Sequence, residues 1–405
     1  MDVENLILVS QYFPPAKGGV ARHVYELANS LTEKGVSVAI VTISNTFKLH
    51  YQIINNKLEI FRLSIPRVSL PIIGYYSSTL CFSALVDKFI SNILKKRDID
   101  GIQFSNISGF VTLLKREMNV PLVTKVHGTW ILNRNIVKMM TSTSDLLLRP
   151  TILFNYLGAL TIDKICYHHS DKIITIREKD KSYLIQRLKI PPEKVSVIYN
   201  GVNHKMFNPY ISGERTRREL KIDNSSLVVL YLGDFSPLKG FHLLPYIVRE
   251  ISKKLKNVIF IIAGSYDETK ILKVQNIFKK LGLSDKVRII GFIPYEKTPE
   301  FYAASDVVII PELTYTITNV HREALACGKP IVTFECDGIE NSYDKKIGFI
   351  IKPGDIRNFI ESTAILLEDE TLRKNIGKNA HKYSLKWSWE KVAEETLQIF
   401  LNVKK

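Results

Sequence analysis

The chain has 405 residues, of which 45% are hydrophobic and 24% charged, so disordered and fibrous classes are excluded and two or three domains are expected. The formal net charge is +16, with 26 basic and 15 acidic side chains in the first 205 residues and 30 and 25 in the remaining 200. This excess in the N-terminal half fits either a phosphate-bearing partner or a lysine-rich surface that is merely solvated.

Short apolar and β-branched runs alternate with amphipathic stretches along nearly the whole sequence. In the N-terminal half, strands are predicted at residues 6–10, 36–43, 58–63, 99–104, 121–126 and 172–176. In the C-terminal half, strands are predicted at residues 227–232, 258–263, 287–290, 307–310 and 331–334. Helices are predicted at residues 19–34, 243–255, 269–281 and 322–327.

Apolar strands separated by helices are typical of parallel sheets covered on both faces, which predicts the α/β class. The strands are too many for one sheet, so we expect two doubly wound, Rossmann-like domains that divide near residues 200–210. Ligands of such sheets bind at the carboxyl ends of the strands, in the loops that lead into helices. Two such domains facing each other would form one cleft.

Two loops in the N-terminal half have the residues for a ligand site. Gly18 and Gly19 precede a helix, where paired glycines allow close approach of a ligand and the helix N-terminus offers amides; a plain turn is the alternative. The spacing is not that of a dinucleotide fingerprint. His127 follows a strand and precedes Gly128, so its imidazole is placed to bind a hydroxyl or carbonyl, although a single histidine is more often structural.

Two loops in the C-terminal half are typical of phosphate binding. Lys239 follows a strand and Gly233 and precedes a helix, where its charge is unfavourable against the helix dipole unless an anion is near. After the strand at 307–310, Thr318 or Asn319 begins a helix whose amides, with that of Val320, suit a phosphate. Glu323 lies about one turn further, placed to accept hydrogen bonds from a ribose diol.

Other candidates for chemistry are weaker. Asp98-Ile-Asp100 imitates the metal-binding motif of some sugar transferases, but it precedes a strand and is interpreted as structural. No His or carboxylate lies at metal-ligand spacing from His127, so no metal site is predicted. The four cysteines form no Cys-x-x-Cys pair, which is typical of a reducing cytosol.

Taken together, these segments resemble glycosyltransferase family 4, whose members have the GT-B fold of two Rossmann-like domains facing across a cleft. The resemblance covers nearly the whole chain. It rests on Pro14-Pro15, Gly18-Gly19-Val20, His127-Gly128-Thr129, residues 197–202, Gly233, Lys239-Gly240, residues 262–264, residues 291–294, residues 323–332 and Trp387-Ser-Trp389-Glu390. It implies an acceptor-side domain at 1–205, a nucleotide-sugar donor domain at 206–385 and a C-terminal helix at 386–405 that crosses back onto the first domain.

The resemblance also implies roles for individual residues. The Gly18–Gly19 loop would face the transferred sugar and the acceptor, and His127 would contact the donor sugar. Lys239 would bind the diphosphate and Glu323 the ribose. A larger set would complete the donor site, comprising Gly264, Ile293 beside the base, and the amides of Thr318, Asn319 and Val320 on the phosphate.

Two positions depart from the family pattern. Asp234 stands where the family usually has an arginine, which removes one cation from the diphosphate site. Tyr315 stands where the family usually has a glutamate that touches sugar hydroxyls, and Glu312 is a possible substitute. Both changes bear on the donor that the site accepts, or on whether it is active.

The resemblance implies a retaining, metal-independent hexosyltransferase that needs no cofactor and uses a UDP- or GDP-linked sugar. The acceptor would be a glycan or a lipid-phosphate-linked molecule. The uncharged stretch 68–86 and the apolar stretch 151–162 fit core structure or contact with an anionic membrane. We expect a cytoplasmic protein, either in solution or at the cytoplasmic face of the membrane, and no nucleic-acid partner. An epimerase or a non-catalytic sugar-nucleotide binding protein are the alternatives.

Overall fold

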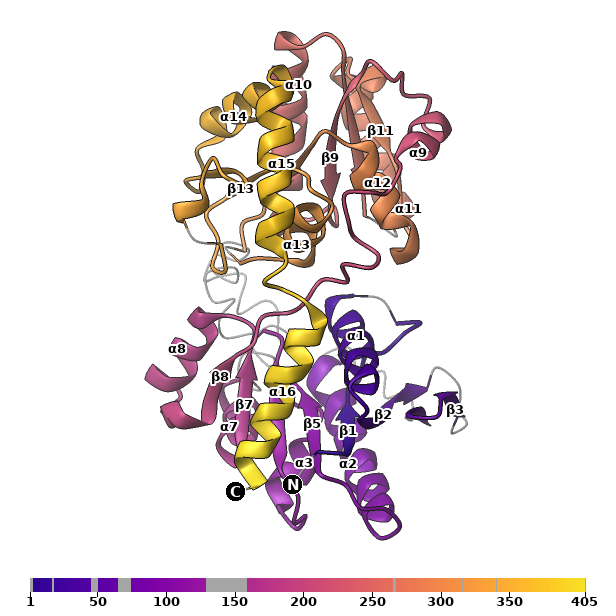
Figure 1. The fold of residues 1–405 in the computed structure, drawn as a ribbon, viewed down its shortest axis with the longest axis vertical. Coiled ribbons are helices and arrows are strands. Elements are labelled where there is room, and N and C mark those ends of the chain that lie inside the picture. The colour runs from indigo at the N-terminus through magenta and orange to yellow at the C-terminus, as the bar shows by residue number, and fades with distance from the viewer. Residues whose placement is uncertain are drawn as a thin grey trace. The chain divides into compact units, whose positions relative to one another are not determined.

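The computed structural model describes residues 3–16, 18–44, 50–64, 74–128, 159–264, 267–314, 316–339 and 341–404. The chain forms two compact units (Figure 1): unit 1 comprises Met1–Gly201 and Trp389–Lys405, and unit 2 comprises Val202–Ser388. Each unit is an α/β domain built on its own sheet. That the two domains face each other across a cleft stays a prediction.

Unit 1 is built on an eight-stranded sheet in the order β3-β4-β2-β1-β5-β6-β7-β8. Neighbouring strands are parallel, except that β3 and β4 form an antiparallel hairpin. The strands are β1 (Asn5–Val9), β2 (Ser37–Ser44), β3 (His50–Asn55), β4 (Leu58–Ser64), β5 (Gly101–Ser105), β6 (Leu122–Val126), β7 (Lys172–Thr175) and β8 (Val195–Val197). The helices are α1 (Gly19–Glu33), α2 (Gly74–Leu94), α3 (Phe110–Lys115), α7 (Lys164–His169), α8 (Glu178–Gln186) and α16 (Trp389–Lys404).

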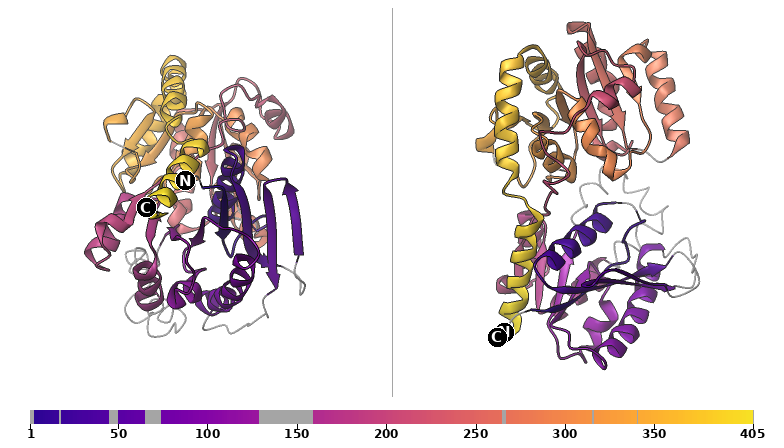
Figure 2. Two further views of the ribbon diagram at one scale, coloured as in Figure 1. Left: turned by 60° about the horizontal axis from the view of Figure 1, so that its bottom comes forward. Right: turned by 45° about the vertical axis from the view of Figure 1, so that its right-hand side comes forward.

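Helices cover both faces of this sheet (Figure 2). In β1, Ile7 and Val9 pack with residues of α2, α3 and α7, whereas Leu6 and Leu8 pack with residues of α1 and α16. Successive side chains of a strand point to opposite faces, so a strand buried on both faces must be apolar throughout. This explains the continuous apolar run at the start of the sequence.

The chain returns to unit 1 as α16, which packs against α1. Phe400 of α16 lies over β5 at Gly101, where an added Cβ would lie 2.3 Å from the phenyl ring. Lys34, at the end of α1, forms an ion pair of 2.6 Å with Glu394. The absence of a side chain at Gly101 therefore lets α16 approach the sheet closely.

The uncharged stretch at 68–86 continues into α2. Phe82, Val86 and Ile90 are fully buried against the sheet, so the described part of the stretch is a core helix. Within the described ranges, no helix combines the length and apolar character needed to cross a bilayer. Residues 68–73, and residues 151–158 of the second apolar stretch, lie outside the described residues.

Unit 2 is built on a six-stranded parallel sheet in the order β11-β10-β9-β12-β13-β14. The strands are β9 (Leu227–Leu232), β10 (Val258–Ala263), β11 (Val287–Ile289), β12 (Val307–Ile310), β13 (Ile331–Phe334) and β14 (Gly348–Ile351). The helices are α9 (Glu214–Glu219), α10 (Leu244–Lys254), α11 (Glu268–Lys280), α12 (Thr298–Ala304), α13 (Asn319–Ala326), α14 (Ile356–Glu368) and α15 (Glu370–Ser384).

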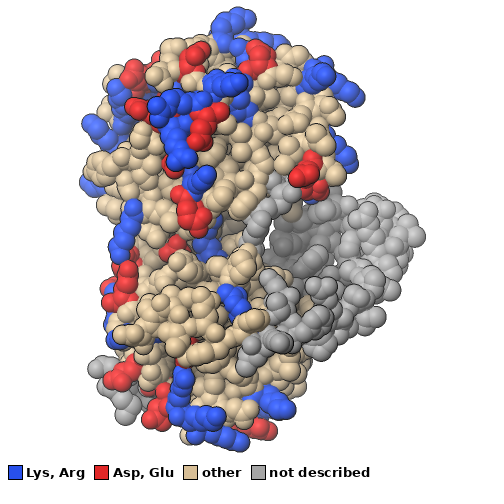
Figure 3. Space-filling view, turned by 90° about the vertical axis from the view of Figure 1, so that its right-hand side faces the viewer, with Lys and Arg blue, Asp and Glu red and all other residues tan. Residues whose placement is uncertain are grey.

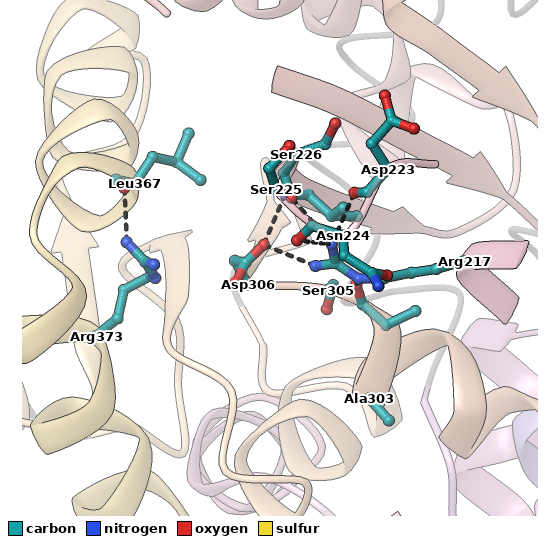
Figure 4. A network of polar contacts seen from close by, with 12 residues as sticks. Arg217, Asp223, Asn224, Ser225, Ser226, Ala303, Ser305, Asp306, Leu367 and Arg373 are labelled. Atoms are coloured by element: carbon teal, nitrogen blue, oxygen red, sulfur yellow. Dashed lines mark hydrogen bonds and ion pairs between the residues drawn. The ribbon is translucent and has the colours of Figure 1, made fainter. Parts of the chain in front are cut away.

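Arg217 ties α9 to the amino-terminal edge of this sheet (Figure 4). Its guanidinium donates to the carbonyl oxygens of Ser226 and Ala304, each at 2.9 Å, and to Oδ2 of Asp306 at 3.1 Å. The same Oδ2 accepts a hydrogen bond from the amide of Val228 at 2.7 Å. One arginine therefore satisfies several acceptors at the edge opposite the carboxyl ends of β9 and β12.

The strands of unit 2 that the sequence predicts at 227–232, 258–263, 307–310 and 331–334 are confirmed residue for residue. The sequence missed β3, β8 and β14. β3 is exposed along its whole length and so has no apolar alternation, and β8 has only three residues. The structural interpretation of Asp98-Ile-Asp100 is confirmed, because Asp100 accepts hydrogen bonds from the amides of Glu4 and Asn5, which lead into β1.

Candidate functional site

The two phosphate-type loops of unit 2 leave neighbouring strands at the point where the strand order reverses. β9 and β12 are adjacent, and the strands next in sequence lie on opposite sides of them, β10 beside β9 and β13 beside β12. Such a reversal opens a crevice at the carboxyl ends of the two strands, where open α/β sheets bind ligands. The loop after β9 carries Lys239, and the loop after β12 carries Glu312.

Lys239 and Glu312 form an ion pair across this point. The ammonium Nζ lies 2.5 Å from Oε1 of Glu312, whose side chain is only 6% exposed, while that of Lys239 is 30% exposed. The hydroxyl of Thr314 also donates to Oε1, and the amide of Leu313 donates to the carbonyl oxygen of Leu238. Lys239 is thus held at the carboxyl edge of the sheet, and Glu312 provides its counter-ion.

Glycines bring the loop after β9 close to its neighbours. An added Cβ at Gly264, which follows β10, would lie 2.5 Å from the carbonyl oxygen of Gly233. Below the loop, the hydroxyl of Tyr231 lies 2.9 Å from the carbonyl oxygen of Asp234 and 3.2 Å from that of Lys239. Burial raises the pKa of Tyr231 well above its usual value, so the phenol stays protonated and donates.

Asp234 lies at the surface of this loop. Its side chain is exposed, and Oδ1 accepts a hydrogen bond of 3.0 Å from the amide of Ser236. The carboxylate therefore caps the local turn, and it is exposed on the same loop that carries Lys239. Tyr315, the other departure from the family pattern, lies outside the described residues.

The helix α13 begins where the sequence predicted, with Thr318 as its N-cap. The ring of His321, in the first turn, accepts at Nδ1 a hydrogen bond of 3.1 Å from the Thr318 amide. An amide can only donate, so Nδ1 is unprotonated, and Nε2 donates to Oγ1 of Thr333 at 2.9 Å. Burial, with the nearby charges of Arg322 and Lys239, lowers the pKa of His321 to about 3, so the ring is neutral at ordinary pH.

The hydrogen bond to His321 reduces the number of amides that are available to bind a phosphate. The Thr318 amide, one of the three named from the sequence, is occupied by His321. For the amides of Asn319 and Val320, no hydrogen bond is found to any described residue. These two amides at the positive end of α13 are therefore the ones available to an anion.

Glu323 lies deeper than the sequence suggested. It is 3% exposed, and its Oε2 accepts a hydrogen bond of 2.9 Å from the hydroxyl of Tyr302 on α12. The hydroxyl of Tyr302 therefore orients the Glu323 carboxylate from a neighbouring helix. Ile293, predicted beside the base, is also largely buried.

The candidate residues of unit 1 lie at the carboxyl edge of its sheet. Gly18 is the N-cap of α1 with φ +117°, a backbone conformation that favours glycine, and Gly19 begins the helix. His127 follows β6, and its amide donates to Oδ1 of Asn106, which follows β5, at 2.9 Å. Burial and the neighbouring Lys125 lower the pKa of His127 to about 3, so its imidazole is neutral.

Sequence reasoning missed several residues of both sites. In unit 1 these are His23, which lies against His127, its partner Asn200, and Lys125, whose buried ammonium donates to the Ile198 carbonyl oxygen at 2.8 Å. In unit 2 they are Tyr231, Tyr302 and His321. None was given a role from the sequence, and the partners of His23, Lys125 and Tyr302 are distant in sequence. Among the described residues, no group of three His, Cys, Asp or Glu is arranged to hold a metal ion.

Two family models match the chain, Glycosyltransferase Family 4 over residues 17–205 and Glycosyl transferases group 1 over residues 212–383. The chain belongs to glycosyltransferase family 4. The family resemblance drawn from its motifs is thereby confirmed, and the protein is a glycosyltransferase.

Individual relatives span nearly the whole chain. The GPI3 subunit of phosphatidylinositol N-acetylglucosaminyltransferase from Saccharomyces cerevisiae is 24% identical over 98% of this chain and 83% of its own length. An uncharacterised glycosyltransferase of Methanocaldococcus jannaschii is 26% identical over 98% of this chain and 97% of its own.

Solved structures confirm the GT-B fold. Sucrose-phosphate synthase from Thermosynechococcus elongatus is similar with a TM-score of 0.81 at 18% identity, covering 99% of both chains. HepE of Anabaena, in complex with UDP and glucose, is similar with a TM-score of 0.70 at 18% identity, covering 98% of this chain and 100% of its own.

Proposed function

We propose that this glycosyltransferase transfers a hexose from a UDP- or GDP-linked donor to a hydroxyl of a glycan or lipid-linked acceptor, with retention of the anomeric configuration. The observation that carries the proposal is that Lys239 and the helix start at Asn319 and Val320 follow the adjacent strands β9 and β12, at the switch point of the unit 2 sheet. One ammonium and two amides offer positive potential for a diphosphate without a metal ion.

Charge develops on the diphosphate as the bond from the sugar breaks, so fixed donors aimed at it lower the barrier. In this proposal Lys239 exchanges Glu312 for the diphosphate when the donor binds. Glu323, oriented by Tyr302, accepts hydrogen bonds from the ribose. His127 is neutral and contacts the sugar through a ring nitrogen. With no carboxylate assigned as nucleophile, the departing phosphate takes the proton of the attacking acceptor hydroxyl.

For the acceptor, we propose a phosphate-bearing lipid or lipid-linked glycan at a cytoplasmic membrane face. The excess of positive charge in the N-terminal half supports this, as does the phosphatidylinositol in the name of the yeast relative. On the face shown in Figure 3, basic and acidic side chains are interspersed, so long-range attraction there is modest. Binding to vesicles with and without anionic lipid, at low and physiological salt, tests the membrane part.

The donor part is tested by thermal shift and hydrolysis with a panel of UDP- and GDP-linked sugars. We expect one donor to raise the melting temperature of the protein and also to be hydrolysed. Lys239→Ala should lose both effects. Lys270→Ala, a change at an exposed lysine of α11, is the control and should keep both. The anomeric configuration of the product is then read by NMR. Binding without any turnover would instead identify a non-catalytic sugar-nucleotide binding protein, and a donor unaffected by Lys239→Ala would contradict the proposed site.

A further inference from the structure

Three side chains of unit 1 converge on the imidazole of His23, in the second turn of α1. Nδ1 of His23 lies 3.0 Å from Oδ1 of Asn200. The ring meets that of His127 edge to face, with 4.6 Å between centroids, and that of Trp389 at 5.3 Å. His23 is 1% exposed, so its imidazole is enclosed by neighbouring side chains.

The hydrogen bond to Asn200 fixes the protonation of the ring. The amide oxygen of Asn200 only accepts, so Nδ1 of His23 carries the proton and Nε2 is unprotonated. Nε2 is buried and has no hydrogen-bond partner among the described residues. Burial, with His127 and Lys125 nearby, lowers the pKa of His23 well below its usual value, so the ring is neutral.

Two partners of His23 lie where the chain passes from one unit to the other. Asn200 stands one residue before the end of the first segment of unit 1, and Trp389 is the first residue of the returning segment. We call these two points, at Asn200 and at Trp389, the chain crossings. They are packed together, because an added Cβ at Gly201 would lie 2.8 Å from the Trp389 indole. His23 therefore touches both points where the chain passes between the units, and also the histidine assigned to the donor sugar.

We propose that His23 is a positioning residue that fixes the imidazole of His127 and links its orientation to the two chain crossings at Asn200 and Trp389. The inference rests on the proposed role of His127 in donor binding. Asn200 holds the tautomer and angle of His23, and the T-shaped contact between the two imidazoles sets the plane of the His127 ring. The amide of His127 is fixed separately by Asn106, so the ring is the part that His23 controls.

The need to fix the plane of the His127 ring explains why a buried polar ring occupies position 23. A neutral imidazole with one satisfied nitrogen packs edge-on against a second imidazole, and its single hydrogen bond prevents rotation about the Cβ–Cγ bond. A phenyl ring of similar size would fill the space but would have no hydrogen bond to hold its angle. Because a misplacement of about 1 Å in a reacting group costs about 100-fold in rate, loss of that bond is expected to appear in turnover.

The first experiment measures kcat and KM for the hydrolysed donor in wild type, His23→Phe and His127→Ala. We expect His23→Phe to lower kcat about 10- to 100-fold while the donor KM changes less than about threefold. The exposed His242→Phe is the control and should match wild type. Ring ¹⁵N chemical shifts of His127 should also move in His23→Phe.

The second experiment uses Asn200→Asp, which preserves shape and places a carboxylate on Nδ1 of His23. The charged and titratable groups known to face His23 are Lys125 and His127, both of which oppose its protonation, so the new carboxylate acts against them. We expect its kcat to approach that of wild type at high pH and to fall at lower pH, as His23 gains a proton, while wild type shows no such transition. Circular dichroism at each pH reports the folded fraction.

Parallel pH profiles for wild type and Asn200→Asp, or a normal kcat in folded His23→Phe, would overturn the inference even if His127→Ala is impaired. A wild type that turns over no nucleotide sugar, or a His127→Ala variant with normal kcat and KM, would instead refute the proposed function on which the inference rests. The two failures are therefore distinguishable.

Discussion

An added Cβ at Gly240 would lie 1.9 Å from the carbonyl oxygen of Pro311, and Gly240 has φ +69°. The loop that carries Lys239 and the loop that carries Glu312 are thus in backbone contact. We expect Gly240→Ala to separate them, lowering nucleoside diphosphate affinity at least tenfold and the stability of unit 2 by about 2 kcal/mol. Calorimetric titration with UDP and GDP and urea unfolding measure both.

Gly282 provides a matched control for that change. It has φ +68°, and an added Cβ would meet nothing within 4 Å. Gly282→Ala therefore carries the same backbone strain, about 1 kcal/mol, without the collision. If the two alanine variants bind nucleotide equally well, contact between the loops is not what shapes the site.

Neutralising Glu312 should strengthen anion binding. In Glu312→Gln, Lys239 loses its counter-ion and the bound diphosphate no longer faces a buried carboxylate. We expect about tenfold tighter binding of UDP or GDP, and a smaller gain at high salt. Titration calorimetry at two ionic strengths measures the effect, with the exposed Glu296→Gln as control. Weaker binding in Glu312→Gln would mean that Glu312 places Lys239 rather than competing for it.

Much of the framework follows from the sequence alone. Strands β9, β10, β12 and β13 are buried runs of apolar residues bounded by turn residues, so composition defines their ends. β3 is not predicted from the sequence because none of its six residues is buried, and its structure depends on pairing with β4. Local pattern identifies an element only where burial imposes the pattern.

The residues of the candidate site also divide into those that the local sequence identifies and those that depend on tertiary packing. Lys239, the start of α13 and His127 were predictable because a strand end, a glycine and a helix start mark them locally. The pairing of His23 with Asn200 joins residues 177 positions apart, and that of Tyr302 with Glu323 depends on how α12 packs beside α13. Glu323 was assigned correctly to its helix. Its burial depends on tertiary packing, which the spacing of residues in the sequence does not predict.

Restoring a cation at position 234 should strengthen donor binding. Asp234 is exposed and makes one hydrogen bond, to the Ser236 amide, so substitution there costs little stability. We expect affinity for a nucleoside diphosphate to rise in the order wild type, Asp234→Asn, Asp234→Arg, by about tenfold overall. The asparagine variant keeps the acceptor oxygen and isolates the charge. An unchanged affinity in Asp234→Arg would place this residue away from the diphosphate.

Loss of the Arg217 guanidinium should destabilise unit 2 (Figure 4). Arg217→Met keeps the aliphatic part but leaves the Ser226 and Ala304 carbonyl oxygens and Asp306 without this donor. We expect a loss of about 2–4 kcal/mol in urea unfolding. Arg215, in the same helix, pairs with Glu219 at the surface, so Arg215→Met should change stability by less than about 0.5 kcal/mol. Equal losses would show that the buried network contributes nothing specific.

Acidification should destabilise the native protein through its neutral histidines. The pKa of His321 is about 3 in the folded state and about 6.5 when unfolded, so only the unfolded chain takes up a proton between these values. Stability is therefore unaffected above about pH 6.5 and falls as pH drops towards 3, with about 2 kcal/mol lost at pH 5 from this residue. Urea unfolding at pH 7 and pH 5 should show a smaller pH-dependent loss in His321→Asn than in wild type. The exposed His242→Asn should retain the full wild-type loss, and an identical pH dependence in His321→Asn would mean that His321 is protonated in the folded protein.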